Sequence, residues 1–203
     1  MPYSTVSFYL ETLVSEKMKS SSVFSYGLDD FFIVLVLYRS SLEQTQSFRS
    51  LQNCNKEEKE IDMLVYDNSP EPNIDSGRIV TNGFQIQYVH DSSNPGVSKA
   101  YNTGIASARK LNKKWILFLD QDTMLDENIL SLFLQSVNKE KDISVFATTL
   151  FASDKKLISP SKYRFKRGFS LSEVPEGRCS LKNIRPINSS VLIATTVFEK
   201  AGL

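Results

Sequence analysis

Two aspartates separated by one residue, Asp120 and Asp122, follow an apolar run that begins at Trp115. If the extended backbone of that run continues, side chains two positions apart point to the same side. Two carboxylates on one side repel each other unless a cation or hydrogen-bond donors compensate their charge. Oxygen ligands favour Mg²⁺ or Mn²⁺, which commonly complete their coordination with phosphates and water. The pair predicts a site for a metal-bridged diphosphate, and the alternative is a solvated turn that leads into a helix.

A third aspartate, Asp67, ends another apolar run and is followed by Asn68, Ser69 and Pro70. Its carboxylate can accept a hydrogen bond from the imide N–H of a uracil or thymine base. The alternative is an Asx turn that closes the strand. Tyr38 follows an earlier apolar run, where its ring can either stack on the same base or pack against the protein.

Residues 94–104 combine a turn with the start of a helix. Asn94-Pro95-Gly96 is a turn sequence, and its glycine lets the backbone approach a ligand closely. Ser98 can cap the helix, whose positive end could face a phosphate, and Lys99 adds positive charge. Asn102, one turn into the helix, could reach the same rim. A turn into a core helix would explain the glycines of this stretch but not Asn102.

Apolar runs and helical patterns alternate along the chain. Strands are predicted from the runs Phe31–Leu37, Ile61–Tyr66, Phe84–Val89 and Trp115–Leu119, and further strands at residues 143–149 and 187–195. Helices are predicted after a capping box at Ser40 and Glu43, from Ser98 to about Leu111, and from Glu127 to Asn138. This alternation predicts an α/β fold with a mostly parallel central sheet. Ligands bind beyond the carboxyl ends of such strands, so the polar strand ends should meet at one rim.

Composition narrows the class of protein further. The chain has 203 residues, with 24 Lys plus Arg and 23 Asp plus Glu, which gives a net charge of 24 − 23 = +1. Such a balance gives no overall attraction to nucleic acid, so we expect no nucleic-acid partner. The two cysteines lack metal-site or redox spacing, and no apolar run is long enough to span a bilayer. We therefore expect a cytoplasmic protein with an N-terminal extension over residues 1–29 and one domain over residues 30–203.

A basic segment lies between the fourth predicted strand and the end of the chain. It contains Lys155, Lys156, Lys162, Arg164, Lys166, Arg167 and Arg178. One interpretation is a loop on the acceptor side that contacts an anionic lipid or glycan, which would give peripheral membrane association. The alternative is a solvated surface loop.

The order of these motifs resembles family 2 glycosyltransferases. The resemblance covers about residues 31–203 and is carried by Tyr38-Arg39, Asp67-Asn68-Ser69, Asn94-x-Gly96-x-x-x-Ala100-x-Asn102-x-Gly104 and Leu119-Asp120-Gln121-Asp122. The Asp-Gln-Asp-Thr form and the later Ile187-Asn188-Ser189-Ser190 resemble the rhamnosyltransferase branch. The resemblance implies a GT-A fold, which is a Rossmann-like three-layer domain, and inverting transfer of a sugar from a nucleotide donor.

The resemblance also implies roles for single residues. Asp67 would bind the base with Tyr38 beside it, Asp120 would contact the ribose or the sugar, and Asp122 would bind the metal. Asn102 would lie in the donor pocket, and we add the neighbouring residues Arg39, Asn94, Gly96, Lys99 and Gln121 to the donor-binding set. Enzymes of this family carry a later acidic residue that deprotonates the acceptor. No acid in residues 150–203 stands in such a motif, so we expect the catalytic base beyond Leu203 and a C-terminally truncated fold.

The leading hypothesis is a glycosyltransferase that moves a sugar, with rhamnose as the candidate, from a UDP- or dTDP-sugar to a polysaccharide or lipid-linked glycan. The reaction would be metal-assisted and inverting, in the cytoplasm or at the inner face of the cell membrane. An alternative is a nucleotide-sugar-binding fragment that is catalytically incomplete and transfers nothing. A third class, the nucleotidyltransferases, usually has a glycine-rich phosphate loop, which Tyr38-Arg39-Ser40-Ser41 lacks.

Overall fold

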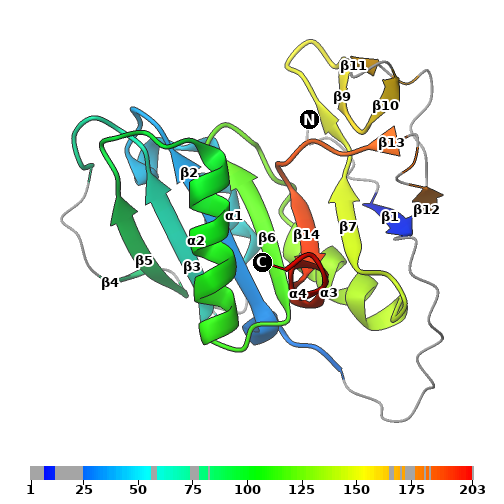
Figure 1. Ribbon diagram of the computed structural model, residues 1–203, viewed down its shortest axis with the longest axis horizontal. Helices are drawn as coiled ribbons and strands as arrows, with labels where there is room; N and C mark the ends of the chain where they lie inside the picture. The colour runs from blue at the N-terminus through cyan, green and yellow to red at the C-terminus, as the bar shows by residue number, and fades with distance from the viewer. Residues whose placement is uncertain are drawn as a thin grey trace.

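A nine-stranded mixed sheet forms the centre of the molecule in the computed structural model (Figure 1). The structure describes residues 7–11, 25–55, 59–73, 78–81, 83–164, 167–169, 171, 177–180, 182 and 184–202. The strands of the sheet are, in spatial order, β12 (Gly177–Ser180), β1 (Ser7–Glu11), β7 (Val145–Thr148), β14 (Val191–Ala194), β6 (Trp115–Asp120), β2 (Phe31–Leu37), β3 (Ile61–Asp67), β5 (Phe84–His90) and β4 (Arg78–Thr81).

Seven neighbouring strands, from β7 to β4, form the main part of this sheet. All of them run in one direction except β14 and β4, which pair antiparallel with their neighbours. The prediction of a mostly parallel central sheet is therefore confirmed. Because β6, β2 and β3 are parallel neighbours, their carboxyl ends lie at the same edge.

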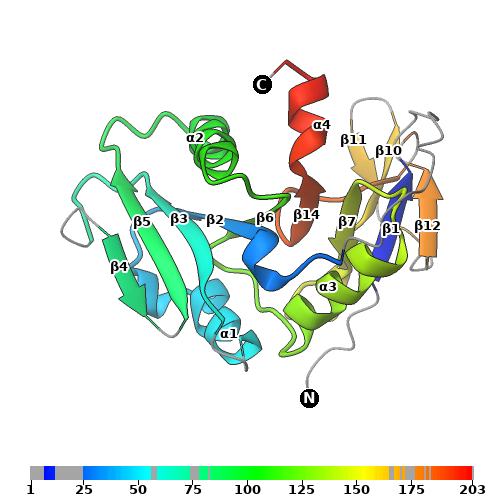
Figure 2. The same ribbon diagram turned by 90° about the horizontal axis from the view of Figure 1, so that it is seen from below.

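Helices cover both faces of the sheet and make three layers. Helices α1 (Gln46–Cys54) and α3 (Ile129–Lys139) lie on one face, and α2 (Val97–Lys110) and α4 (Thr195–Lys200) lie on the other (Figure 2). Short 3₁₀ turns, η1 (Leu28–Asp30) and η2 (Leu42–Gln44), precede β2 and α1. All seven residues of β2 are buried, as expected for a continuous apolar run between two helical layers.

Helix α2 packs closely on β2. A Cβ added at Gly104 would overlap the side chain of Val34, so only glycine permits this approach. Ala100 and Ala108, the small residues on either side, are also fully buried. Helix α2 therefore contacts the sheet through a face of small residues.

Both predicted helix caps are wrong. The first helix begins at Gln46, where the Thr45 hydroxyl accepts a hydrogen bond from Phe48 N at 3.3 Å. The second begins at Val97 with Gly96 as its cap, at φ 87°, and no side chain caps it. The turn η2 lies between Ser40 and the first helix, which therefore starts later, and the positive φ of Gly96 turns the chain directly into the second helix.

A small lobe follows the carboxyl end of β7 (Figure 1). It consists of the hairpin β8 (Leu150–Phe151) and β9 (Leu157–Ser159), and of a three-stranded sheet of β10 (Ser161–Arg164), β11 (Arg167–Phe169) and β13 (Ile184–Arg185). The lobe contains most of the predicted basic segment, of which Lys166 lies outside the described residues.

Part of the predicted N-terminal extension joins the central sheet. Strand β1 pairs antiparallel with β7 and parallel with β12, and residues 1–6 and 12–24 lie outside the described residues. The boundary predicted at residue 30 stays a prediction. In the part of the chain that the structure describes, no helix combines the length and apolar character needed to cross a membrane.

Candidate functional site

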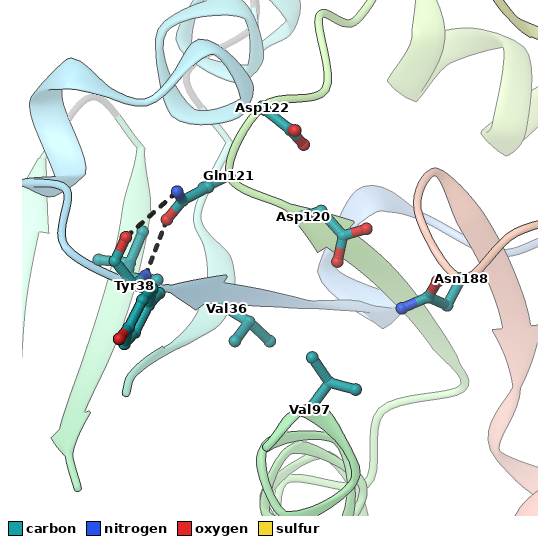
Figure 3. A pocket seen from close by; sticks show the side chains of 8 residues that line it. Val36, Tyr38, Val97, Asp120, Gln121, Asp122 and Asn188 are labelled. Atoms are coloured by element: carbon teal, nitrogen blue, oxygen red, sulfur yellow. Dashed lines mark hydrogen bonds between the residues drawn. The ribbon is translucent and has the colours of Figure 1, made fainter. Parts of the chain in front are cut away.

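An open cleft of about 350 Å³ lies at the carboxyl ends of β2 and β6 (Figure 3). The ends of β2 and β6 with the residues just after them, the first turn of α2 and the loop before β14 line it: Val36, Leu37, Tyr38, Val97, Asp120, Gln121, Asp122 and Asn188. Apolar side chains from β2 and α2 make one wall. Carboxylates and amides make the other, which is the composition expected for a polar ligand with an uncharged part.

The side chain of Gln121 fastens the end of β6 to the end of β2. Its Oε1 accepts a hydrogen bond from Tyr38 N at 2.8 Å, and its Nε2 donates to Tyr38 O at 3.2 Å (Figure 3). One amide thus satisfies both backbone groups of Tyr38. Gln121 therefore holds this wall of the cleft together, and its predicted contact with the donor stays a prediction.

Two buried hydroxyls anchor the loop that carries Asp120 and Asp122. The Ser47 hydroxyl contacts the Asp120 carbonyl and accepts a hydrogen bond from Thr123 N at 3.1 Å. The Ser189 hydroxyl accepts from Asp120 N at 3.0 Å and lies 2.6 Å from the hydroxyl of Thr123. These contacts hold the backbone from which both carboxylates project, and the Asp120 carboxylate lies on the side of Asn188 (Figure 3).

Asp120 is half-buried, and its surroundings disfavour the ionised form of its carboxyl group. Burial raises the pKa of its carboxyl group, and the neighbouring Asp122 raises it further. A hydrogen bond from Tyr101, at 3.5 Å, offsets part of this effect. In turn, burial and the charge of Asp120 raise the pKa of Tyr101 to about 12. A carboxylate in this position gains more than a solvated one from a nearby cation.

Sequence reasoning assigned no role to two residues beside Asp120, namely Tyr101 and Asn188. The Asn188 amide donates to the Tyr101 hydroxyl at 2.6 Å, and the Tyr101 ring packs on Phe118 with 4.6 Å between centroids. Both residues stand in motifs that the sequence had singled out, so a signal was present. Their pairing joins positions 87 residues apart, which spacing along the chain does not predict.

Asp120 and Asp122 are the described residues of the cleft that could hold a metal ion. Asp122 is exposed, and the described part of the chain contains no group of three His, Cys, Asp or Glu that could bind a metal. The two carboxylates form a set of hard oxygen donors. Such a set fits Mg²⁺ or Mn²⁺ when a ligand phosphate and water supply the remaining positions.

Asp67 lies at the same edge of the sheet but does not line the cleft. Its side chain is fully buried, and it accepts hydrogen bonds from Ser69 N at 2.8 Å, Asn73 Nδ2 at 2.7 Å and Tyr88 Oη at 2.6 Å. Burial alone would raise its pKa, but these hydrogen bonds hold the pKa below the ordinary value. The contact with Ser69 is the Asx turn of the alternative interpretation. These donors occupy the carboxylate in this structure, and the contact of Asp67 with a base stays a prediction.

Tyr38 and Arg39 stand beside the cleft. The Tyr38 side chain is 41% exposed and lines it, and the Arg39 guanidinium lies 5.1 Å from the ring centroid. Arg39 has φ 52°, and its N–H donates to the Ser69 hydroxyl at 2.7 Å. Tyr38 therefore offers an accessible ring where a base was predicted, whereas Arg39 does not line the cleft.

The donor-binding role predicted for residues in the stretch 94–102 stays a prediction. Asn94, Lys99 and Asn102 are exposed but do not line the cleft, and Gly96 serves as the helix cap. The residue of this stretch that lines the cleft is Val97. Because Ala100 and Gly104 face the sheet, Asn102, which lies two positions from each, is on the opposite side of α2.

Comparison with known proteins agrees with this architecture. Residues 33–191 match the family described as Glycosyl transferase family 2. The chain belongs to this family. No curated protein matches this glycosyltransferase family 2 chain.

Solved structures of S. aureus TarS show the same fold. TarS 1-349 is 17% identical, and the alignment covers 85% of this chain and 49% of that one with a TM-score of 0.54. Its complexes with UDP (17% identical, covering 85% and 48%) and with UDP-GlcNAc (16% identical, covering 85% and 47%) both have a TM-score of 0.50. This family 2 chain therefore has the GT-A fold, and it spans about half the length of these TarS chains.

Proposed function

We propose that this chain binds a nucleoside diphosphate sugar in the cleft between β2 and β6 and serves the inverting transfer of that sugar to a glycan. The observation that carries the proposal is the anchored loop that directs Asp120 and Asp122 into the cleft. An electrostatically unfavourable pair of carboxylates, held rigidly at the ligand-binding edge of an α/β sheet, is suited to a cation and a diphosphate.

The polar and aromatic residues of the cleft, with Tyr101 beside it, have separate parts in this proposal. Asp120 and Asp122 would hold Mg²⁺ or Mn²⁺, which when bound neutralises charge on the departing diphosphate. Tyr101 and Asn188 orient Asp120, and Gln121 keeps the ends of β2 and β6 together. The exposed ring of Tyr38 offers a stacking surface for the base.

The finer assignments extend this proposal. The donor would be a UDP- or dTDP-sugar, with rhamnose as the candidate sugar, because the Asp-Gln-Asp-Thr and Ile187-Asn188-Ser189-Ser190 segments resemble that branch. The complexes of S. aureus TarS with UDP and UDP-GlcNAc support a uridine donor. The acceptor would be a polysaccharide or a lipid-linked glycan, reached in the cytoplasm or at the inner face of the cell membrane.

Calorimetric titration tests the binding step. The chain is titrated with UDP, dTDP, ADP and GDP, each with Mn²⁺ and again with EDTA. We expect UDP or dTDP to bind at least tenfold more tightly than the purine diphosphates, and only in the presence of Mn²⁺. Absence of binding of every nucleotide to the folded protein would overturn the proposal.

A second candidate is donor binding without transfer. Among the described residues that line the cleft, the acids are Asp120 and Asp122, and both are assigned to the cation. Neither is then left to deprotonate an acceptor hydroxyl. This candidate predicts nucleotide binding with no release of UDP or dTDP from a sugar nucleotide in the presence of glycan acceptors, and sugar transfer by this chain would refute it.

A further inference from the structure

The three-stranded sheet of the lobe presents cations and an aromatic ring on one face. Strand pairing places Lys162 opposite Phe169 and Arg164 opposite Arg167. Directly paired residues and residues two positions apart share a face of a sheet. All four side chains are exposed, and Phe169 is 47% exposed. We call these four residues the lobe face.

The neighbouring hairpin of the lobe has the same character. Phe151 and Ile158 are 37% and 45% exposed, and Lys155 and Lys156 stand in the turn between their strands. The turn also carries Asp154, whose carboxylate accepts a hydrogen bond from Lys156 N at 3.0 Å. The described residues of β9, β10, β11 and β13 contain no acid. The lobe therefore combines a local excess of positive charge with accessible apolar side chains.

This combination distinguishes between possible partners. An ordinary solvated surface would account for the cations but not for the exposed apolar side chains. A polyanionic glycan would pair with the cations and leave the apolar side chains in water. The surface of an anionic bilayer accommodates both, because lipid phosphates attract cations while apolar side chains enter the boundary with the acyl chains. Apolar side chains exposed beside cations are typical of protein surfaces that lie in the membrane interface.

We propose that the lobe face docks on an anionic lipid bilayer. The inference deepens the proposed function, and it rests on that function only for the nature of the acceptor. The lobe follows the carboxyl end of β7, which runs in the same direction as β6, so lobe and cleft lie at the same edge of the sheet. Docking would therefore bring the mouth of the cleft close to an acceptor carried by a lipid.

Vesicle co-sedimentation without nucleotide tests the proposal. The whole chain is mixed with vesicles of phosphatidylcholine alone or with 30% phosphatidylglycerol, an amount of about one anionic lipid in three. We expect at least tenfold tighter binding to the anionic vesicles, weakened by salt. Replacing Lys162→Gln and Arg167→Gln together should lower the affinity about 30-fold, since each cation contributes about 1 kcal/mol and 1.4 kcal/mol is tenfold.

Two further variants separate lipid docking from attraction to any anion. Phe169→Ser keeps every charge and should lower vesicle affinity about tenfold through lost apolar burial. Arg49→Gln with Lys110→Gln removes one exposed Arg and one exposed Lys from the helices and should leave vesicle binding unchanged. Thermal unfolding of all variants should match that of the unsubstituted chain.

Equal binding to neutral and anionic vesicles would overturn the proposal, as would full affinity in the charge variant. Retained vesicle affinity in Phe169→Ser, with equally tight binding of soluble dextran sulfate, would also overturn it and indicate a polyanion site. The same variants titrated with UDP and Mn²⁺ should bind as the unsubstituted chain does. Failure of nucleotide binding in all of them would count against the cleft and leave the lipid result standing.

Discussion

Asp67 and Asp120 occupy equivalent places, since each ends a parallel strand that pairs with β2. Asp67 is fully buried among protein donors, which hold its pKa below the ordinary value. Asp120 is half-buried, has a weak hydrogen bond from Tyr101 and a like-charged neighbour in Asp122, and its pKa is raised. The difference shows that the hydrogen-bond donors around a carboxylate, more than its place at a strand end, decide whether it stabilises the fold or is left for a ligand.

The largest effect on stability should come from Asp67→Asn. The new amide would place an NH₂ group or a neutral oxygen against donors from Ser69, Asn73 and Tyr88. We expect a loss of about 3 kcal/mol in the free energy of unfolding, measured in urea. Asp154→Asn, at an exposed turn, is the matched control and should change stability by less than about 0.5 kcal/mol. A loss at Asp67 no larger than that of the control would break the comparison.

Asp120→Asn should affect nucleotide binding rather than stability, in contrast to Asp67→Asn. Even residues that only orient a metal ligand cost roughly 10–100-fold in affinity, so loss of a ligand should weaken Mn²⁺-dependent UDP binding by about 100-fold or more. Stability at pH 7 should not fall, because the fold disfavours the ionised form of this group. Calorimetry and urea unfolding on one preparation measure both quantities. A variant that binds UDP normally but unfolds more easily would make Asp120 a structural residue like Asp67.

The two aspartates should also give stability profiles of opposite sign against pH. The folded-state pKa of Asp67 is lowered, so its contribution is present above the ordinary aspartate pKa of about 3.9 and is lost as pH falls through the folded value. The folded-state pKa of Asp120 is raised, so its contribution is present at low pH and is lost as pH rises through the folded value. Urea unfolding of each Asn variant and the unsubstituted chain between pH 3 and 7 measures both differences. Differences of the same sign would contradict the assignment.

Gln121→Ala should give the smallest effects, both on the stability of the fold and on UDP binding. It removes the two hydrogen bonds to the Tyr38 backbone, which should lower stability by about 1 kcal/mol and loosen the wall of the cleft. We expect UDP affinity to fall about tenfold, less than for either cleft aspartate. Gln135→Ala, an exposed glutamine on α3, is the control. Unchanged UDP affinity in Gln121→Ala would show that the hydrogen bonds between Gln121 and Tyr38 do not shape the cleft.

Local signals predicted the sheet well. The predicted run Phe31–Leu37 coincides with β2, because a strand buried on both faces is apolar throughout. The short strands of the lobe escaped prediction, since their exposed and basic residues show no core pattern.

Long-range contacts explain what the sequence left open at the site. The surroundings of Asp67 depend on Tyr88, which is 21 residues away, and those of Asp120 depend on Ser189, which is 69 residues away. The types and spacing of the residues identified the acids that could do chemistry. Only the folded chain shows which of those acids is already saturated with hydrogen bonds.

The central claim is that the carboxylates of Asp120, at the end of β6, and Asp122, just after it, hold the cation on which nucleotide binding depends. The most direct measurement is the affinity for UDP with Mn²⁺ in Asp122→Asn, compared with Asp29→Asn, which removes the same charge from an exposed turn before β2. We predict a loss of about 100-fold in Asp122→Asn, unchanged affinity in Asp29→Asn and unchanged thermal unfolding in both. Full Mn²⁺-dependent affinity in a folded Asp122→Asn protein would contradict the account.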